Sequence, residues 1–487
     1  MVFFGFLGVR TLPDILSVGI DIGTSTTQLV FSRIVMENTT GYFTVPRISI
    51  VDKEVIYKSP VHLTPLTTPV LIDGEAVRDL VAEEYRQAGF TPADVDTGAV
   101  IITGESARKE NAAAVLEKLS GFAGEFVVST AGPDLESVIA GKGSGAFQYS
   151  LDNDCATVNL DIGGGTTNLV LFDRGEAVSK GCLDIGGRLI RLSPDLTVES
   201  VSPAAALVAR AVGVTLVPGE RTTLEDLTRI TDKMADLLAQ ALYVKPQEPL
   251  LRAVRTPESS WLDPAGRRIH RICFSGGVAD CIGRASGDPV PYGDIGALLG
   301  RSIARGALTA ALPVIPGTET IRATVVGAGT YTTSISGSTI TYAAELLPMK
   351  NLPALKLTPA EQDRCLTGDG AALAEQTAWF LEQSGAERMI LALPGLADPE
   401  YRQLQALAAA LAEGLERGLP PGAPVLVALE QDITKALGLL LERALSGRRK
   451  VACIDGIRVE QGDYVDLGRP VMDGMVIPVV VKTLLFG

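Results

Sequence analysis

The chain has 487 residues, of which 46% are hydrophobic and 21% are charged, so it is too long for one ordinary core and too apolar for a disordered protein. We expect roughly two to four globular domains. The formal net charge of −14 argues against a nucleic acid or an anionic membrane as the main partner, because both would be repelled.

The first clear pattern along the chain is GIDIGTSTTQLVF at Gly19–Phe31, which recurs as NLDIGGGTTNLVLF at Asn159–Phe172. Each copy reads as a hairpin: an apolar strand that ends in aspartate, a glycine turn, and a return strand rich in β-branched residues. The two copies are separated by the length of a small domain, which is far too long for a solenoid repeat. The sequence therefore predicts two duplicated domains.

Amphipathic helices follow each hairpin and place the chain in the α/β class. Residues 73–89 and 106–121 read as helices after the first hairpin. Residues 222–242 form another after the second hairpin, with Thr222 or Thr223 as its N-cap.

A third part of the chain is expected beyond the proline-rich stretch 311–320, which we take as a linker. RATVVGAGT, ERMILALPGL and APVLVAL read as strands there, a long helix lies between the last two, and the C-terminal tail reads as strands and tight turns. The predicted units are residues 1–150, 151–310 and 321–487.

The two hairpins suit a polyphosphate, because glycine turns allow several backbone N–H groups to converge on one anion. The candidate phosphate contacts are Gly23, Thr24, Ser25 and Thr26 in the first copy, and Gly163, Gly164, Gly165, Thr166 and Thr167 in the second. Asp21 and Asp161, at the ends of the two inner strands, would hold Mg²⁺ directly or through water from opposite sides. A single Asp-x-Gly turn is common in hairpins, whereas two matching copies favour a nucleotide clamp. No Walker motif occurs.

These hairpins resemble the phosphate-1 and phosphate-2 loops of the actin-like ATPase superfamily, which includes actin, the heat-shock chaperone ATPases and the sugar kinases. Residues 131–145 and 292–306 are similar to the two helices that connect its lobes. Gly276 and Gly277 resemble its adenosine-binding turn, with VVGAG at 325–329 as a rival glycine turn. The resemblance implies duplicated actin-like (ribonuclease-H-like) ATPase domains with an additional C-terminal α/β unit.

A narrower resemblance covers most of the chain. The phrases IITGESARKENAAAVLE, TAGPDLESVIAGKGSGA and VVGAGTYTTSISGSTI and the C-terminal tail resemble the reactivating factor of ethanolamine ammonia-lyase. That family implies a cytoplasmic, chaperone-like ATPase, associated with a bacterial microcompartment. With ATP and magnesium it releases damaged cobalamin from the inactivated lyase, so that intact adenosylcobalamin can bind.

Hydrolysis needs a group that orients or deprotonates a water beside the γ-phosphate. In chaperone relatives an acidic residue near the first connecting helix contributes, and Asp134 and Glu136 are the candidates in this chain, with Glu105 as a weaker one. Each could equally be a carboxylate favoured by the dipole at a helix N-terminus.

Two other classes of function stay open. One is a small-molecule kinase on the same fold, and the other is a scaffold that binds nucleotide without acting as a motor. Two histidines leave little room for a histidine metal site or a Ser–His–Asp triad. The six cysteines form no CxxC pair, so we expect buried free thiols.

Overall fold

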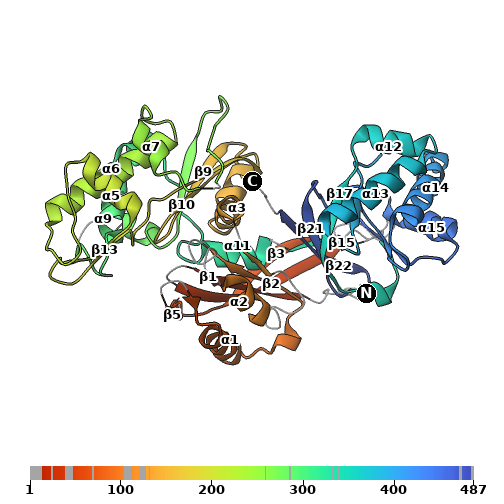
Figure 1. Ribbon diagram of the computed structural model, residues 1–487, viewed down its shortest axis with the longest axis horizontal. Coiled ribbons are helices and arrows are strands. Elements are labelled where there is room, and N and C mark those ends of the chain that lie inside the picture. The colour runs from red at the N-terminus through yellow and green to blue at the C-terminus, as the bar shows by residue number, and fades with distance from the viewer. Residues whose placement is uncertain are drawn as a thin grey trace, which may run out of the picture.

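The computed structural model describes residues 14–23, 26–38, 48–68, 71–103, 111–119, 128–130, 132–257, 259–283, 287–331, 333–337, 340–396, 398–470 and 474–483. Three bodies are visible in Figure 1: the first lobe in the centre, the second lobe on one side and the C-terminal unit on the other. Within the described residues, no helix is long and apolar enough to cross a membrane.

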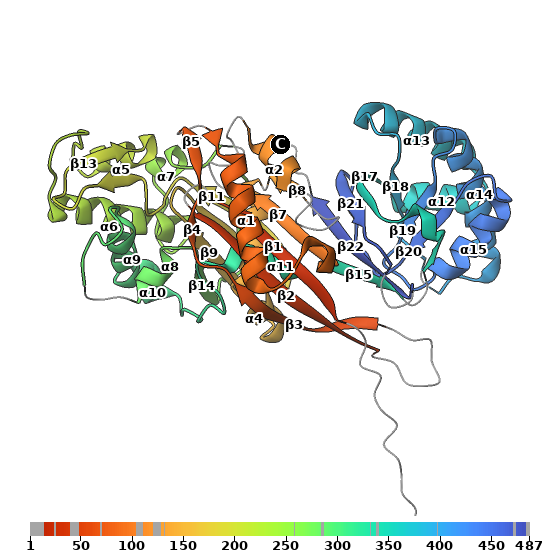
Figure 2. The same cartoon turned by 90° about the horizontal axis from the view of Figure 1, so that it is seen from below.

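The first lobe is a mixed sheet with the strand order β3-β2-β1-β7-β8, in which β1 and β2 are antiparallel and β1, β7 and β8 are parallel. Its strands are β1 (Ile15–Ile22), β2 (Thr26–Asn38), β3 (Ile48–Lys58), β4 (His62–Leu63), β5 (Leu66–Thr68), β6 (Leu71–Ile72), β7 (Thr97–Ile102) and β8 (Val128–Thr130). Helices α1 (Gly74–Ala88) and α2 (Ala112–Leu119) cover one face of this sheet, as Figure 2 shows.

The second lobe repeats this arrangement. Its main sheet has the order β11-β10-β9-β14, with β9 antiparallel to β10 and parallel to β14. The strands are β9 (Ala156–Ile162), β10 (Thr167–Asp173), β11 (Glu176–Leu183), β12 (Ile190–Leu192), β13 (Val198–Val201) and β14 (Arg271–Ser275). The helices are α3 (Pro133–Gly143), α4 (Ala146–Asp152), α5 (Pro203–Ala211), α6 (Leu224–Ala241), α7 (Pro249–Ala253), α8 (Ala279–Ile282), α9 (Gly296–Ala304) and α10 (Ala307–Ala311). The predicted duplication of a ribonuclease-H-like domain is confirmed.

Local sequence signals account for several helix boundaries. Asp73 caps α1 by accepting a hydrogen bond from the Ala76 amide at 3.0 Å, and Gly89 ends the helix with φ 78°. Thr223 caps α6 through the Asp226 amide at 3.1 Å, so of the two threonines considered Thr223 is the N-cap. The helix predicted at 106–121 is described only as α2, because residues 104–110 lie outside the described residues.

The segment RATVVGAGT, predicted as a strand, is instead helix α11 (Ala323–Tyr331). Its β-branched residues and glycines favour a strand locally, but packing against α3 decides the outcome. A Cβ at Gly143 would overlap the carbonyl oxygen of Ala323, and one at Gly327 would overlap that of Ile139. The glycines therefore let two helix backbones touch, and VVGAG is a helix crossing, not a nucleotide-binding turn.

The second connecting helix was also assigned wrongly. Residues 292–306 contain α9, which packs against α6 and α8 on the outer face of the second lobe. The helix that pairs with α3 is α11, which lies on the inner face of the first-lobe sheet and contacts β1, β2 and β7. Thus α3 lines the second lobe, α11 lines the first, and the two helices meet between the lobes.

The stretch 311–320 does not hang free as a linker. Ile315 donates to the carbonyl of Ile272 at 2.9 Å, so the chain runs beside β14 before it enters α11. Because α11 packs on the first lobe, the C-terminal unit predicted to begin at residue 321 has its own sheet only from β15 (Thr333–Gly337) onward.

The C-terminal unit is an eight-stranded sheet with the order β15-β22-β21-β17-β18-β19-β20-β16. Its other strands are β16 (Thr341–Tyr342), β17 (Met349–Lys356), β18 (Ile390–Ala392), β19 (Val425–Ala428), β20 (Val451–Ile454), β21 (Asp463–Leu467) and β22 (Val476–Thr483). Its helices are α12 (Pro359–Leu366), α13 (Gly370–Ser384), α14 (Tyr401–Gly418) and α15 (Thr434–Leu445). The two edge strands are close in sequence, since β15 ends at Gly337 and β16 begins at Thr341.

The last strand attaches this unit to the first lobe. Val476 packs with Ile15 and Ile34, and Val480 packs with Ile101 of the first-lobe sheet. The first lobe and the C-terminal unit therefore share buried apolar contacts.

The cysteine prediction is confirmed. All six cysteines are free; five are buried, and Cys155 is partly exposed.

Candidate functional site: the cleft between the lobes

The two predicted metal-binding aspartates occupy equivalent places in the two lobes. Asp21 lies near the end of β1 and Asp161 near the end of β9, and their side chains are only 8% and 6% exposed. The Thr103 hydroxyl donates to Asp21 Oδ1 at 2.8 Å, and the Ser275 hydroxyl donates to Asp161 Oδ1 at 2.6 Å. Thr103 directly follows β7, which runs parallel to β1. Ser275 is the last residue of β14, which runs parallel to β9.

Sequence reasoning missed these two hydroxyl residues. Each directly precedes a glycine, in IITG and FSGG, but the two stand at different register positions: Ser275 pairs with Asp161, whereas Thr103 lies two residues beyond the partner of Asp21. A hydroxyl residue followed by glycine is too short a pattern to identify either residue in the sequence.

Burial makes the aspartate pair electrostatically unusual. Desolvation raises the pKa of Asp21 to about 7, with the hydrogen bond from Thr103 opposing the shift and the charge of Asp161 adding to it. Desolvation raises the pKa of Asp161 to about 6, and the hydrogen bonds from Ser275 and Asn168 oppose that shift. The charge of Asp161 therefore reaches Asp21, and the two buried carboxylates belong to one electrostatic site.

A hard divalent cation fits this arrangement, since it prefers oxygen ligands and would relieve the burial of both charges. No group of three or more histidine, cysteine, aspartate or glutamate residues that could hold a metal occurs among the described residues. A cation held here would therefore have to complete its shell with phosphate oxygens and water.

The two glycine turns are closed by matching backbone hydrogen bonds. The Gly23 amide donates to the Thr26 carbonyl at 2.8 Å, and the Gly163 amide donates to the Thr166 carbonyl at 2.9 Å. The predicted contacts Thr24 and Ser25 lie outside the described residues. Gly164 and Gly165 belong to the bend between Gly163 and Thr166.

A second pair of glycines supports the triple-glycine turn and was not predicted. A Cβ on Gly186 would overlap the Gly164 carbonyl, and the Gly187 amide donates to the Gly163 carbonyl at 2.9 Å. The DIGGR motif that contains both glycines was the available signal. Thr167, by contrast, is buried, and its hydroxyl donates to the Ile185 carbonyl at 2.7 Å, so that hydroxyl holds the strands together.

The predicted nucleoside turn lies directly beside the end of β9. Gly276 has φ 83°, and a Cβ there would overlap the Ile162 carbonyl. The space beside Gly277 is more open, since the nearest atom to an added Cβ is on Ile321 at 3.9 Å. This turn therefore presents bare backbone next to Asp161.

Residues 319–322 bind both lobes as the chain crosses between them. The Gln28 side-chain amide donates to the Ile321 carbonyl at 3.2 Å, and Arg322 donates to the Ser59 carbonyl at 2.9 Å. On the second lobe, the Thr320 hydroxyl donates to Asp280 Oδ1 at 2.5 Å.

The predicted catalytic carboxylates lie in the first turn of α3, where Asp134 is 7% and Glu136 is 8% exposed. The Ser260 amide donates to Asp134 Oδ1 at 3.1 Å, and the Ser260 hydroxyl donates to Asp134 Oδ2. Both oxygens of Asp134 thus hold α3 to the second lobe. The weaker candidate, Glu105, lies outside the described residues.

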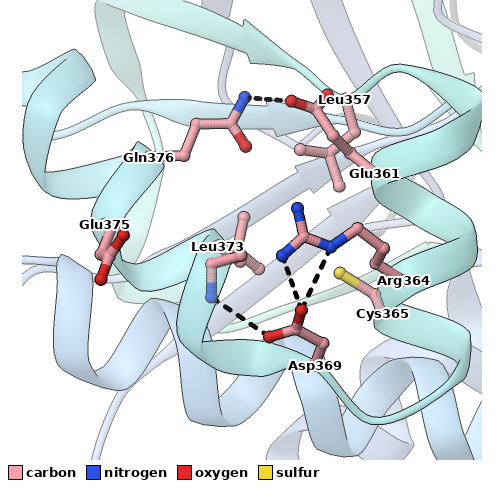
Figure 3. Close-up of a pocket in the computed structure, with 9 residues that line it drawn as sticks. Leu357, Glu361, Arg364, Cys365, Asp369, Leu373, Glu375 and Gln376 are labelled. Atoms are coloured by element: carbon pink, nitrogen blue, oxygen red, sulfur yellow. Dashed lines mark hydrogen bonds and ion pairs between the residues drawn. The ribbon is translucent and has the colours of Figure 1, made fainter.

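A cavity of about 380 Å³ lies far from these loops, between α12 and α13 of the C-terminal unit (Figure 3). Three of its charged groups already have partners: Arg364 donates to Asp369 Oδ2 at 2.7 Å, and the Glu361 carboxylate accepts from the Thr358 amide at 2.7 Å. This cavity is no competitor for the cleft.

Two ribonuclease-H-like lobes with matching Asp-x-Gly hairpins define the fold of the actin-like ATPase superfamily. A family model described as "Ethanolamine utilisation protein EutA" matches residues 13–487. The chain belongs to this family, which confirms the resemblance seen in the sequence.

Two relatives carry the name "Ethanolamine ammonia-lyase reactivase EutA". The protein of Escherichia coli (strain K12) is 37% identical over 474 residues, covering 97% of this chain and 99% of that one. The protein of Salmonella typhimurium is 36% identical over 477 residues, with the same coverage of 97% and 99%.

Solved structures similar to this chain include a Ppx/GppA family member from Aquifex aeolicus, with 16% identity, a TM-score of 0.38, and coverage of 65% of this chain and 97% of that one. Another is ethanolamine utilization protein EutJ from Carboxydothermus hydrogenoformans, with 18% identity, a TM-score of 0.32, and coverage of 66% and 91%. Because these TM-scores are low, the assignment of the fold rests on the strand order described above and not on these structures.

Proposed function

We propose that the protein is an ATP-dependent reactivating factor that releases damaged cobalamin from inactivated ethanolamine ammonia-lyase, so that intact adenosylcobalamin can bind. One observation carries this proposal: more than a third of the residues are identical to those of two proteins that are named as reactivases of that lyase. These identities extend over nearly the full length of both chains. The duplicated hairpins support nucleotide binding as the source of the driving force.

In this proposal ATP lies between the two hairpins. The amides of the turns that begin at Gly23 and Gly163 donate to the phosphates, and Gly276 and Gly277 face the nucleoside. Asp21 and Asp161 hold Mg²⁺ directly or through water. Bound there, Mg²⁺ would offset the charge of the phosphates and of the two carboxylates.

Coupling to the lyase follows from the position of the nucleotide. A ligand that touches both lobes favours the closed cleft only to the extent that it binds the closed state better. Hydrolysis removes the γ-phosphate contacts and shifts that balance. The lobes then move about the crossing of α3 and α11, which changes the surface offered to the lyase.

We also propose that an acid at the start of α3 orients the attacking water. Glu136→Gln and Asp134→Asn are the variants to compare by single-turnover ATP hydrolysis. Loss of hydrolysis with retained ATP affinity identifies the acid. Loss of second-lobe stability alone assigns Asp134 to the anchoring contact with Ser260.

The decisive experiment incubates cobalamin-inactivated ethanolamine ammonia-lyase with the protein, adenosylcobalamin, ATP and Mg²⁺ in the cytoplasmic pH range. Lyase activity should recover, and Asp161→Asn should abolish recovery while the exposed control Asp152→Asn retains it. No recovery with the unaltered protein would contradict the proposal.

The alternatives give different outcomes in the same assay. A small-molecule kinase would hydrolyse or transfer phosphate faster with an alcohol or sugar, and would ignore the lyase. A scaffold would still rescue the lyase when Asp161→Asn has removed ATP hydrolysis.

A further inference from the structure

The carbonyl groups of the two turn glycines are held in different ways. In the second lobe, the Gly163 carbonyl accepts from the backbone amide of Gly187 at 2.9 Å. In the first lobe, the matching Gly23 carbonyl accepts from a side chain, the hydroxyl of Thr64, at 2.8 Å. A backbone N–H is kept by every residue except proline, whereas a side-chain hydroxyl is lost in most substitutions.

Thr64 is placed for this contact by the short strand β4. Residues His62 and Leu63 pair with Thr27 and Thr26, at the beginning of β2, so the chain passes directly beside the turn. Thr64 follows this strand and is 7% exposed. Its oxygen also lies 3.1 Å from the Thr27 hydroxyl oxygen.

The hydrogen-bond directions in this group follow from counting protons. A threonine hydroxyl has one proton, and that of Thr64 is used on the Gly23 carbonyl. The Thr27 hydroxyl must therefore donate to Thr64. In the first lobe, hydrogen bonds thus lead from Thr27 through Thr64 to the Gly23 carbonyl. In the second lobe, the matching Thr167 donates to the Ile185 carbonyl, and Gly187, two residues further on, donates to the Gly163 carbonyl.

Beyond Thr64, β4 is tied to helix α1 by a buried carboxylate. Glu84 of α1 is 1% exposed; it accepts from the Tyr57 hydroxyl at 2.6 Å, and its other oxygen lies 2.7 Å from His62 Nε2. Contacts thus run without a break from α1 through His62 and Thr64 to the turn.

We propose that Thr64 is a positioning residue of the nucleotide site, which holds the Gly23 carbonyl and so fixes Gly23 at the start of the first glycine turn. This inference rests on the proposed nucleotide binding and names a residue that acts through the turn, not on the nucleotide itself.

The test uses Thr64→Val, which keeps the shape of the side chain and removes the hydroxyl. In nucleotide-free protein, amide hydrogen exchange in the first hairpin should become at least roughly fivefold faster, because the substitution removes both the bond to the Gly23 carbonyl and the acceptor of the Thr27 hydroxyl. The second hairpin, residues 159–172, serves as the internal control and should be unchanged. Thr64→Ser should restore the original exchange.

The second readout is the affinity for ATP and ADP with Mg²⁺. Thr64→Val should weaken both by about five- to tenfold, with restoration by Thr64→Ser. The matched control is Thr97→Val, a fully buried threonine at the far end of the same sheet. This control should leave the affinity unchanged.

The results separate the two proposals. If the unaltered protein binds no nucleotide, the proposed function fails, while the exchange experiment still tests the role of Thr64. Unchanged exchange in the first hairpin, or equal acceleration in both hairpins, would overturn the positioning role. So would a failure of Thr64→Ser to restore exchange and affinity.

Discussion

Replacing Asp161 by asparagine should stabilise the empty protein while destroying its response to Mg²⁺ and ATP. The carboxylate is almost fully buried, and burial raises its pKa from 3.8 to about 6. A raised pKa in an acid means that the folded state disfavours the charged form. The charge therefore costs stability at every pH where Asp161 is ionised.

The size of the effect follows from the shift. About two pKa units correspond to roughly 3 kcal/mol, at about 1.4 kcal/mol per unit. The cost is absent below the unfolded pKa of 3.8, grows as the pH rises, and is complete above the folded pKa of about 6. The difference between Asp161→Asn and the unaltered protein should be about 3 kcal/mol at pH 8 and roughly half of that at pH 5.

Tryptophan fluorescence provides the assay. The chain has two tryptophans: Trp261 packs on the core of the second lobe, and Trp379 in the C-terminal unit is already 59% exposed. In a Trp379→Phe background, Trp261 reports on the second lobe alone. The transition should rise by roughly 6–12 °C at pH 8, since about 1 kcal/mol moves a lobe of this size by some 2–4 °C.

In the presence of Mg²⁺ and ATP, the unaltered protein should become more stable than Asp161→Asn. The unaltered protein should gain stability from the ligands according to their affinity, and Asp161→Asn should gain little. The exposed control Asp152→Asn should match the unaltered protein throughout. A lower transition temperature for empty Asp161→Asn at pH 8 would refute the reasoning, because it would mean that the buried charge is not a net cost.

Three further substitutions test the packing around the cleft. Gly327→Ala should destabilise the protein by about 1–3 kcal/mol in urea unfolding, because its Cβ would press on the backbone of α3. Gly132→Ala has open space around it and serves as the control; equal losses would contradict the close crossing. Gly186→Ala should displace the triple-glycine turn and weaken ATP binding at least tenfold, measured by calorimetry; unchanged affinity would separate that turn from the site. Asp134→Ala should lower second-lobe stability by about 2–3 kcal/mol, and no loss in the Trp261 assay would contradict the anchoring hydrogen bonds.

Internal repetition explains why the core of the site could be predicted. The Asp-x-Gly hairpins are local in sequence, so one strand, one turn and one return strand carry the whole signal. Asp21 and Asp161 accordingly lie at equivalent strand ends, and burial and charge bring them into one electrostatic unit.

The parts that sequence reasoning missed depend on contacts between distant segments. Ala323–Tyr331 has the composition of a strand and becomes a helix because Gly327 can meet the backbone of α3. The hydroxyl of Thr64 reaches the first turn from 41 residues away, and Ser275 reaches Asp161 from 114 residues away. No local pattern distinguishes such hydroxyls from those of ordinary surface threonines and serines.

The packing of β22 against the first lobe has a mechanical consequence. Val476 packs with residues of the first-lobe sheet. Val480 lies in a cluster that also holds Ile101 of that sheet and Ile139 of α3, so β22 joins the C-terminal unit to the first lobe beside the crossing of α3 and α11. In the proposed function, the second lobe moves relative to the first about this crossing of α3 and α11. The C-terminal unit would then move with the first lobe, and Figure 1 places that unit on the opposite side of the first lobe from the second lobe.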